Sequence, residues 1–155
     1  MAGGCGQIYN RYRRAAGLTQ ERAAELLGTA TRTLSSWETD EHCPPDEMVV
    51  LMADVYQAPT LPLEHLRAVS RVGRELIPVA HSKSLAEAAL TLLTAIRDFD
   101  VDDRELALMR ICADGKVSPG EARQFSLIIG QLNEIVAAAY EVRLAVRGGG
   151  GDAED

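Results

Sequence analysis

Apolar residues recur three and four positions apart through most of the chain, and this spacing limits its fold more than any other feature. It is the repeat that places apolar side chains on one face of an α-helix. A β-strand would need apolar and polar residues to alternate, and β-branched residues never alternate over more than a few positions here. The sequence therefore predicts an all-α fold with no sheet.

Glycine and capping residues divide the first half of this pattern into short helices. A helix over residues 7–16 is expected to end at Gly17, whose tolerance of positive φ suits a C-terminal cap. Thr19 then begins a second helix, because its hydroxyl can accept from the free NH groups of the first turn. This helix ends at Gly28, and a third follows over residues 31–37 after a turn so short that the two helices must cross sharply. The residues predicted to point into the core are Ala23, Ala24, Leu27, Leu34 and Trp37.

Two more helical segments are expected before the chain changes character. The fourth helix begins near Pro45, a suitable first-turn residue, and ends at Pro59. Its predicted inward residues are Met48, Leu51, Met52 and Val55. A short fifth turn of helix covers residues 60–66, and the segment 68–83 then mixes charges, a glycine and a proline without a sustained period. That mixture predicts a connector.

The helices of the second half begin at two S-x-x-E sequences, the spacing of a capping box. Ser84 to Glu87 opens one helix, and Ser118 to Glu121 opens the last and longest one. Between them the acidic cluster at 97–105 is expected to bend or interrupt the helix. The last helix carries an apolar stripe wider than one antiparallel neighbour needs to cover, which predicts self-association. The stripe consists of Phe125, Ile128, Ile129, Leu132, Ile135, Val136, Ala139, Val142 and Val146.

These elements predict two helical domains between glycine-rich ends. The expected division is a disordered segment at 1–6, a helical domain at 7–67, the connector at 68–83, a helical dimerisation domain at 84–147 and a disordered glycine-rich, acidic tail at 148–155.

The overall charge argues against a strong nucleic-acid binder. Sixteen Lys and Arg stand against twenty-three Asp and Glu, which gives a net charge of −7. The acidic residues are unevenly distributed along the chain. The segment from Gln7 to Glu38 contains five arginines and only three glutamates, which gives it a local net charge of +2. Attraction of that segment to phosphate is therefore expected to be weak.

We expect no disulfide, metal site, cofactor or catalytic centre. Cys5, Cys43 and Cys112 are odd in number and form no C-x-x-C pair, which is typical of a protein of the reducing cytoplasm. The segment 114–121 is similar to half of a calcium-binding loop, but its first and third ligand positions fall on Arg110 and Cys112, which supply no carboxylate. The histidines accompany no nucleophile pattern, so an enzyme is not expected. No run approaches the about 18 apolar residues of a membrane span.

Several residues in the first half stand at the spacing of a known motif: Arg13, Gly17-Leu18-Thr19-Gln20, Ala24, Leu27-Gly28, Thr33-Leu34-Ser35 and Trp37-Glu38. This set resembles the phage-repressor (Cro/Xre-like) helix-turn-helix family, and the likeness extends over residues 7–67. It implies a five-helix, lambda-repressor-like head, followed here by a helical hairpin or small bundle. It also implies a sequence-specific, double-stranded DNA-binding transcriptional regulator. "VGRELIP" and "ADGKVSPGE" are loosely similar to a subgroup of bacterial and phage regulators.

The resemblance also implies roles for individual residues. The second helix would lie against the phosphate backbone while the third enters the major groove. Arg32 is the one residue of the third helix able to make a bidentate contact with guanine. The implied DNA-contacting residues are Thr19, Gln20, Thr29, Thr31, Arg32, Thr33, Ser35, Ser36 and Thr39. Arg13 and Glu38 would pair in a structural role.

Two features depart from the family pattern. Ala30 stands where the family usually has a capping Ser or Thr, so Thr29 or Thr31 is expected to cap the third helix and shift its start. The loop after that helix carries acids where the family often supplies cations, namely Asp40, Glu41, Asp46 and Glu47. Their repulsion from phosphate would lower affinity.

The sequence leaves several alternatives open, one of them a repressor that responds to a ligand held in a cleft between subunits. The same helical motif serves some proteins as a docking unit, so the chain is either a DNA-binding dimer or a protein-interaction module of the antitoxin or adaptor kind. Arg11 and Arg14 are either phosphate contacts or part of a solvated helix face. Trp37, three residues after Leu34, is expected in the core rather than on a stacking surface.

Overall fold

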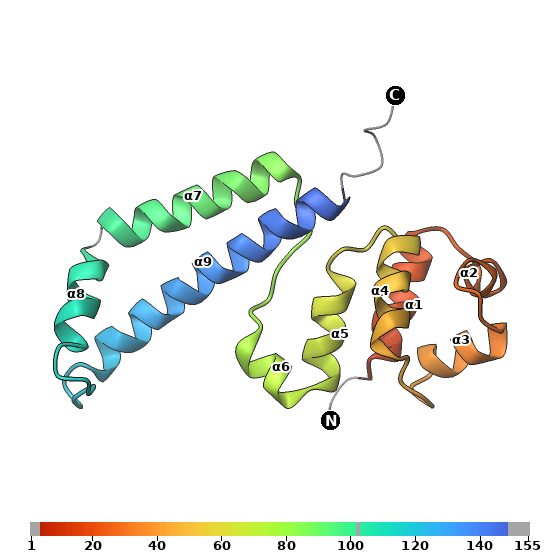
Figure 1. Cartoon of the computed structure of the whole chain (residues 1–155), viewed down its shortest axis with the longest axis horizontal. Helices are drawn as coiled ribbons and strands as arrows, with labels where there is room; N and C mark the ends of the chain where they lie inside the picture. The colour runs from red at the N-terminus through yellow and green to blue at the C-terminus, as the bar shows by residue number, and fades with distance from the viewer. Residues whose placement is uncertain (1–3, 102, 149–155) are drawn as a thin grey trace. The chain divides into compact units, whose positions relative to one another are not determined.

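The computed structural model describes residues 4–101 and 103–148, and these residues form helices and loops without a strand. The prediction of an all-α fold is confirmed. The chain divides into two compact units (Figure 1), which we call the head, residues 4–82, and the tail, residues 83–146.

The head contains six helices within the described residues. They are α1 Gly6–Ala15, α2 Gln20–Leu26, α3 Thr31–Glu38, α4 Asp46–Val55, α5 Leu61–Val69 and α6 Arg71–Leu76. Gly17 and Gly28 adopt φ angles of 70° and 63°, so the predicted glycine ends of α1 and α2 are confirmed. Thr19 also caps α2 as predicted, since its Oγ1 accepts from the backbone NH of Arg22 at 3.2 Å.

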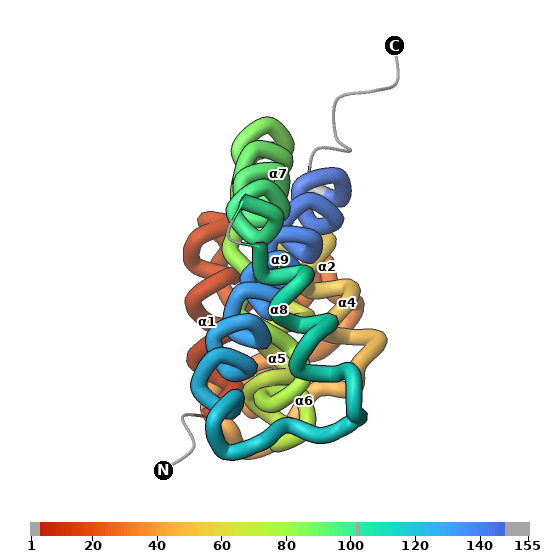
Figure 2. Tube along the Cα trace, turned by 90° about the vertical axis from the view of Figure 1, so that its left-hand side faces the viewer, coloured from red at the N-terminus to blue at the C-terminus, as the bar shows by residue number. Residues whose placement is uncertain are grey.

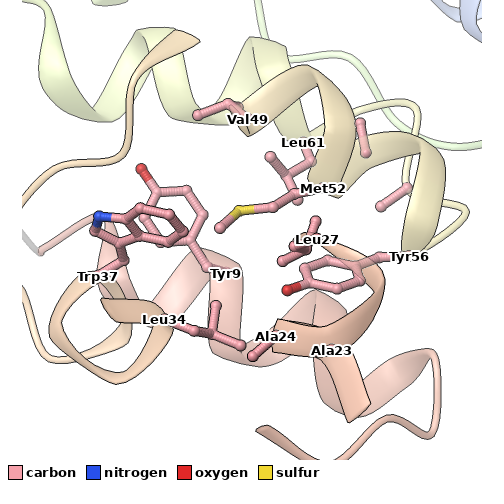
Figure 3. Packing of buried hydrophobic residues seen from close by; sticks show 12 residues of the cluster. Tyr9, Ala23, Ala24, Leu27, Leu34, Trp37, Val49, Met52, Tyr56 and Leu61 are labelled. Atoms are coloured by element: carbon pink, nitrogen blue, oxygen red, sulfur yellow. The ribbon is translucent and has the colours of Figure 1, made fainter. Parts of the chain in front are cut away.

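One apolar cluster holds the first five helices together. All five residues predicted to point inward from α2 and α3 are buried, and the fully buried side chains Tyr9, Met52 and Leu61 join them from α1, α4 and α5. Figure 3 shows Met52 near the centre of this cluster, with Tyr9 and Trp37 to one side. Burial of these large side chains from separate helices stabilises the head as one unit.

The inward face of α4 differs from the prediction. Val49 is 1% exposed and Met52 fully buried, whereas Leu51 is 39% exposed. Leu51 is one residue from Met52 and therefore points about 100° away around the helix axis. The helix also ends at Val55, before Pro59, because Gln57 adopts a left-handed φ of 53° that no α-helix continues.

The connector expected at 68–83 contains regular structure. Helix α5 runs to Val69, and α6 follows at Arg71–Leu76. Ser70 starts the second of these helices, since its Oγ accepts from the backbone NH of Gly73 at 3.1 Å. This cap is not evident from the sequence, because charged residues with no apolar period surround it.

The N-terminal helix begins inside the segment expected to be disordered. Gly6 is the first residue of α1, and its NH donates to Asp40 Oδ1 at 2.7 Å. A Cβ at Gly6 would lie 2.5 Å from the carbonyl oxygen of Glu38, so only glycine allows α1 to start this close to the end of α3. At the other end Gly148, expected in the disordered tail, is the last residue of α9. The predicted disorder at 1–3 and 149–155 lies outside the described residues.

The tail consists of α7 Leu85–Val101, α8 Arg104–Ile111 and α9 Ala122–Gly148. Helices α7 and α9 run in opposite directions, and α8 spans between their far ends (Figures 1 and 2). The break expected in the acidic cluster is present between α7 and α8, where Asp103 has a φ of 49°.

The predicted capping box at Ser84 and Glu87 is complete in the tail, whereas the one at Ser118 and Glu121 has only its glutamate half, since Glu121 N donates to the backbone oxygen of Ser118. Ser84 N donates to Glu87 Oε2 at 3.0 Å, and Glu87 N donates back to Ser84 Oγ at 3.3 Å. Ser118 N donates to Glu121 Oε2 at 2.9 Å, one turn before α9 begins. These bonds satisfy NH groups that have no partner within the helix.

Three further features concern the described residues as a set. Their three cysteines are free thiols. No described helix has both the length and the apolar content to cross a membrane. Within 4–101 and 103–148, no group of three or more His, Cys, Asp and Glu side chains could hold a metal ion.

Candidate nucleic-acid interface

The α2–turn–α3 unit is built by a glycine and a small side chain. Gly28 N donates to Glu25 O at 3.1 Å, and Thr29 N donates to Ala24 O at 2.9 Å, which closes the end of α2. Ala24 is 2% exposed, so its methyl group lies where the neighbouring helices approach one another. The turn therefore places α3 across α2 with little freedom.

Helix α3 starts without a side-chain cap, so the expectation that Thr29 or Thr31 caps it is wrong. Its N-cap is Ala30, in an extended conformation with ψ of 144°, and no side chain hydrogen-bonds the first turn. The Ala30 carbonyl accepts from Leu34 N at 3.1 Å, so the first helical turn closes through the backbone. The helix keeps the start at Thr31 that the apolar spacing predicts, without the shift of one residue.

Glu38 connects three helices at the end of α3. The Arg13 guanidinium of α1 donates to it twice, from Nε to Oε1 at 2.6 Å and from Nη2 to Oε2 at 2.9 Å. Asn10 Nδ2, also of α1, donates to Oε2 at 2.7 Å, and Gln20 Nε2 of α2 does so at 2.9 Å. Arg13 and Glu38 are 6% and 8% exposed, so this network is largely removed from water.

The network also sets the protonation of Glu38. Burial alone would raise the pKa of this carboxyl, but the hydrogen bonds from Arg13, Gln20 and Asn10 outweigh it and hold the pKa below its usual value. Glu38 is therefore ionised at neutral pH and fixes the orientation of α3 against α1 and α2. The resemblance implied the pair with Arg13, whereas the roles of Asn10 and Gln20 appear only in the structure.

Arg32 and Thr33 are the exposed members of the predicted DNA-reading set on α3. The guanidinium of Arg32 makes no hydrogen bond or ion pair within the described part of the chain, and it stands in the first turn of the helix. Thr31, Ser35 and Ser36 are half-buried beside it. The side chains of this first turn are thus available to an external partner.

The hydroxyl groups near the end of α3 have local partners. Ser36 Oγ donates to Thr33 O at 2.8 Å, and Thr39 Oγ1 donates to Ser35 O at 3.0 Å. These bonds use the hydroxyl protons and leave the oxygens free to accept. In this conformation the two hydroxyls are suited to a donor such as a base amino group rather than to a phosphate oxygen.

The predicted backbone-contacting residues on α2 and the turn lie at exposed or half-buried positions. Thr19 is exposed, while Gln20 and Thr29 are half-buried. Because Gln20 donates one amide hydrogen to Glu38, only its second hydrogen is available to a phosphate. Arg22 pairs with Glu25 at 2.6 Å on the exposed side of α2.

Two of the acids after α3 have partners inside the head. Asp40 accepts from Gly6 N, as described above, and it adopts a φ of 63°. Asp46 Oδ1 lies 3.6 Å from Nε2 of His65, whose Nδ1 is 2.6 Å from the hydroxyl of the buried Tyr9. Sequence reasoning treated these acids only as a repulsive charge, because their partners lie far away in the sequence.

Residues 10–63 match the family model described as helix-turn-helix, which spans most of α1, all of α2 to α4 and the start of α5. The head is a Cro/Xre-like helix-turn-helix domain. Proteins of this family are DNA-binding transcription regulators. Comparison with curated proteins and with solved structures gives no match for the chain.

The matched residues include α2, the turn at Gly28 and α3. Glu38 ties both of these helices to α1. The tail lies outside the matched residues. The helix-turn-helix domain is therefore the part of the chain to which the family assigns DNA binding.

Proposed function

We propose that the chain is a sequence-specific regulator of transcription that acts as a dimer, most simply as a repressor, on double-stranded DNA in the cytoplasm. Helix α3 enters the major groove in this proposal. One observation carries it: in a helix-turn-helix domain, Arg32 stands in the exposed first turn of α3 with a free guanidinium, while Glu38 anchors the other end of the helix.

Arg32 is the base reader in this proposal. In motifs of this type the N-terminal residues of the second helix contact base edges. A guanidinium donates two parallel hydrogen bonds to O6 and N7 of guanine, a contact that discriminates among bases by about 1–3 kcal/mol. Thr31, Thr33, Ser35 and Ser36 contact neighbouring base edges or backbone and add weaker preferences.

The remaining residues of the predicted set hold the backbone. Thr19, Gln20 and Thr29 lie at the start of α2 and in the turn, and Thr39 lies at the end of α3, where its hydroxyl must turn away from Ser35 O before it can donate to a phosphate. Contacts to phosphate position the domain without reading sequence. They are few, and Glu41 and Glu47 stand exposed in the following segment. One head therefore binds weakly, and the affinity falls with added salt.

A dimer compensates for this weakness. Two joined heads on half-sites about one helical turn apart convert the second binding event into an intramolecular one. We propose that the tail joins them, and that the operator is accordingly a palindrome.

A second candidate function is a protein-interaction module of the antitoxin or adaptor kind, with weak or no DNA binding. It is favoured by the exposed apolar side chains of the tail and by the net charge of −7. The two candidates differ in what the intact chain selects. A regulator enriches one DNA sequence, whereas an interaction module enriches none and holds a different protein on its tail.

The test is selection from random DNA duplexes by the intact chain at two salt concentrations, followed by sequencing. We expect a palindromic motif and a steep loss of binding with salt. Arg32→Ala should relax the preference at one base pair of each half-site by about 1–3 kcal/mol. Arg71→Ala is the control, since it removes the same charge from α6, at the opposite end of the head from α2 and α3 in Figure 1.

Each contrary result has a defined meaning. If no sequence is enriched at low salt, the chain is not a sequence-specific regulator. If Arg32→Ala and Arg71→Ala weaken all sequences equally, Arg32 contributes charge and reads no base.

A further inference from the structure

The tail leaves much of its apolar surface uncovered. Among its described residues, those counted as buried and apolar are Ala88, Ile111, Ile128, Ala138 and Leu144. Large apolar side chains on all three helices are 38–72% exposed. A soluble unit with so few buried side chains and so many exposed ones lacks part of its core.

Two apolar stripes run along α9, and both repeat with alternating spacings of three and four residues. The inner stripe contains the buried Ile128 and Ala138, with half-buried residues between and after them. Its members are Ile128, Gln131, Ile135, Ala138, Val142 and Ala145. The other stripe, which we call the seam, includes Ile129 at 38% and Val136 at 44% exposure and the exposed Arg143, and its remaining members are half-buried. Its members are Phe125, Ile129, Leu132, Val136, Ala139 and Arg143.

The spacing of the seam is that of a coiled-coil contact. Positions four and then three residues apart form a stripe that stays in contact with a second helix over many turns. The inner stripe provides the apolar surface that α9 buries from Ile128 to Ala138, and toward the end of the helix Glu141 and Leu144 are buried as well. The seam is therefore a second helix-packing surface, and its exposed and half-buried side chains are only partly covered in the described chain.

Helix α7 adds an apolar stripe on the same side. Ala88 is fully buried, whereas Leu85, Leu93 and Ile96 are 47–64% exposed. On both α7 and α9 the exposed stripe is turned about 100° from the buried side, in the same sense around the helix axis. Because the two helices run in opposite directions (Figures 1 and 2), stripes turned in the same sense fall on one face of the pair.

We propose that this face packs against the same face of a second copy of the chain, with the two α9 helices antiparallel along their seams. This inference rests on the dimer of the proposed function and assigns its interface. In this arrangement Ile129 lies opposite Ala139 of the second copy, and Leu132 lies opposite Val136. Large and small side chains alternate across the contact, as close packing requires.

Charge supports an antiparallel second copy. The ten residues from Gln124 to Asn133 carry no charge. This half of the seam therefore cannot form an ion pair with a charged partner and suits an uncharged, apolar one. At the other end Arg143 occupies a seam position. A parallel pair would bring the two Arg143 side chains together, whereas an antiparallel pair places each over a Phe125 ring, a favourable cation–π contact. Arg143 already lies 5.8 Å from the centre of the Tyr140 ring in its own helix.

The size of the face is sufficient for a dimer. Phe125 and Arg143 are separated by about 27 Å along the helix at 1.5 Å per residue, and two helices of about 10 Å diameter give a face about 20 Å wide. The projected area is about 540 Å², and interdigitated side chains raise the accessible area toward the about 800 Å² that each partner buries in a typical stable interface.

The first test compares two charge substitutions in the full chain. Ile129→Glu places a carboxylate in the seam of each copy and should weaken dimerisation at least about 100-fold. Leu127→Glu is the matched control, because Leu127 is more exposed, at 59%, and lies on the side of α9 away from the seam. Sedimentation velocity at micromolar concentration should show a dimer for the native chain and Leu127→Glu, and a monomer for Ile129→Glu. A monomeric native chain, or equal behaviour of the two variants, overturns the assignment.

The second test measures orientation and remains informative if Ile129→Glu fails to fold. Asn133 and Ser126 are both exposed and occupy equivalent positions beside the seam, two turns apart. In the antiparallel pair Asn133 lies near the two-fold axis, next to Asn133 of the second copy, whereas Ser126 faces the region of Tyr140. Asn133→Cys should therefore form a disulfide-linked dimer in excess of the native chain under mild oxidation, and Ser126→Cys should not. Equal cross-linking of both variants indicates a parallel pair and overturns the proposal.

The outcomes separate the interface from the proposed function. A chain that dimerises through the seam and enriches no DNA sequence overturns the regulator and leaves the interface standing. A monomer that enriches a DNA sequence overturns the interface and leaves the regulator.

Discussion

Replacing Glu38 with alanine removes the acceptor of the four hydrogen bonds that connect α1, α2 and α3. The Arg13 guanidinium would stay buried, with the bond from its Nη1 to Leu18 O at 2.7 Å as its remaining hydrogen bond within the described chain. Removing one partner of a buried ion pair costs about 3–5 kcal/mol, because the other charge is left uncompensated. Since small domains are stabilised by about 5–15 kcal/mol in total, much of the stability of the head depends on this one carboxylate.

Trp37 makes the measurement direct. It is the sole tryptophan of the chain, it is 7% exposed in the core of the head, and it is adjacent to Glu38. Urea unfolding followed by its fluorescence therefore reports on the head alone. We expect Glu38→Ala to lower the free energy of unfolding by about 3–5 kcal/mol and the melting temperature by more than about 12 °C.

Two controls test the reasoning. Glu25→Ala breaks the exposed pair with Arg22 and should cost less than about 1 kcal/mol. The double variant Arg13→Met, Glu38→Leu should be less destabilised than either single change, because no unpaired charge is left in the core. A cost below about 1 kcal/mol for Glu38→Ala would refute the argument that a buried network holds α3 in place.

The lowered pKa of Glu38 gives the same network a pH signature. A carboxyl whose folded pKa lies below its unfolded value, about 4.3, contributes stability that is present above that pH and lost as pH falls through the folded pKa. The native head should therefore lose stability below about pH 4.3 more steeply than Glu38→Ala does.

Three other substitutions test the backbone and the buried polar groups of the head, each by Trp37 fluorescence. Ala30→Ser should stabilise the head by about 0.5–2 kcal/mol, since it supplies the missing cap of α3, and an unchanged midpoint would contradict this. Gly28→Ala should cost about 1–2 kcal/mol through its φ of 63° alone, because a Cβ there meets no atom within 4 Å; a cost-free change would show that the turn relaxes. Burial lowers the pKa of His65 against the opposing effect of Asp46, so stability should fall as pH drops below about 6.5 toward the folded pKa. His65→Gln should flatten that part of the pH profile, and an unaltered slope would assign it to another group.

Local chemistry made much of the head predictable. Thr19, Gly17 and Gly28 act through the backbone of their own turns, so their positions in the sequence suffice to locate the ends of α1 and α2. The capping box at Ser84 and Glu87 was predictable for the same reason. The inward residues of α2 and α3 were also predictable, because apolar residues spaced three and four apart lie on only one face of each helix.

Predictions failed where the deciding partner was distant. Helix α4 is apolar on several sides, so its sequence does not show that Val49 rather than Leu51 faces the core. Gly6 belongs to a glycine-rich end by composition, but it starts α1 because the end of α3 lies against it. The sequence suggests that Asp40 is only an exposed acid, but its carboxylate accepts a hydrogen bond from Gly6 N and so stabilises the start of α1 against the end of α3.

The sequence by itself determined that this protein is helical, where most of its helices begin and end, and that α2 and α3 form a helix-turn-helix unit, because these properties depend on residues a few positions apart. The tertiary structure alone decided that Asn10, Arg13 and Gln20 meet on Glu38, since they come from separate helices. It also decided that α9 keeps a second apolar stripe after packing in the tail. A sequence shows how apolar residues repeat, but only the packed helices show which repeats are already covered.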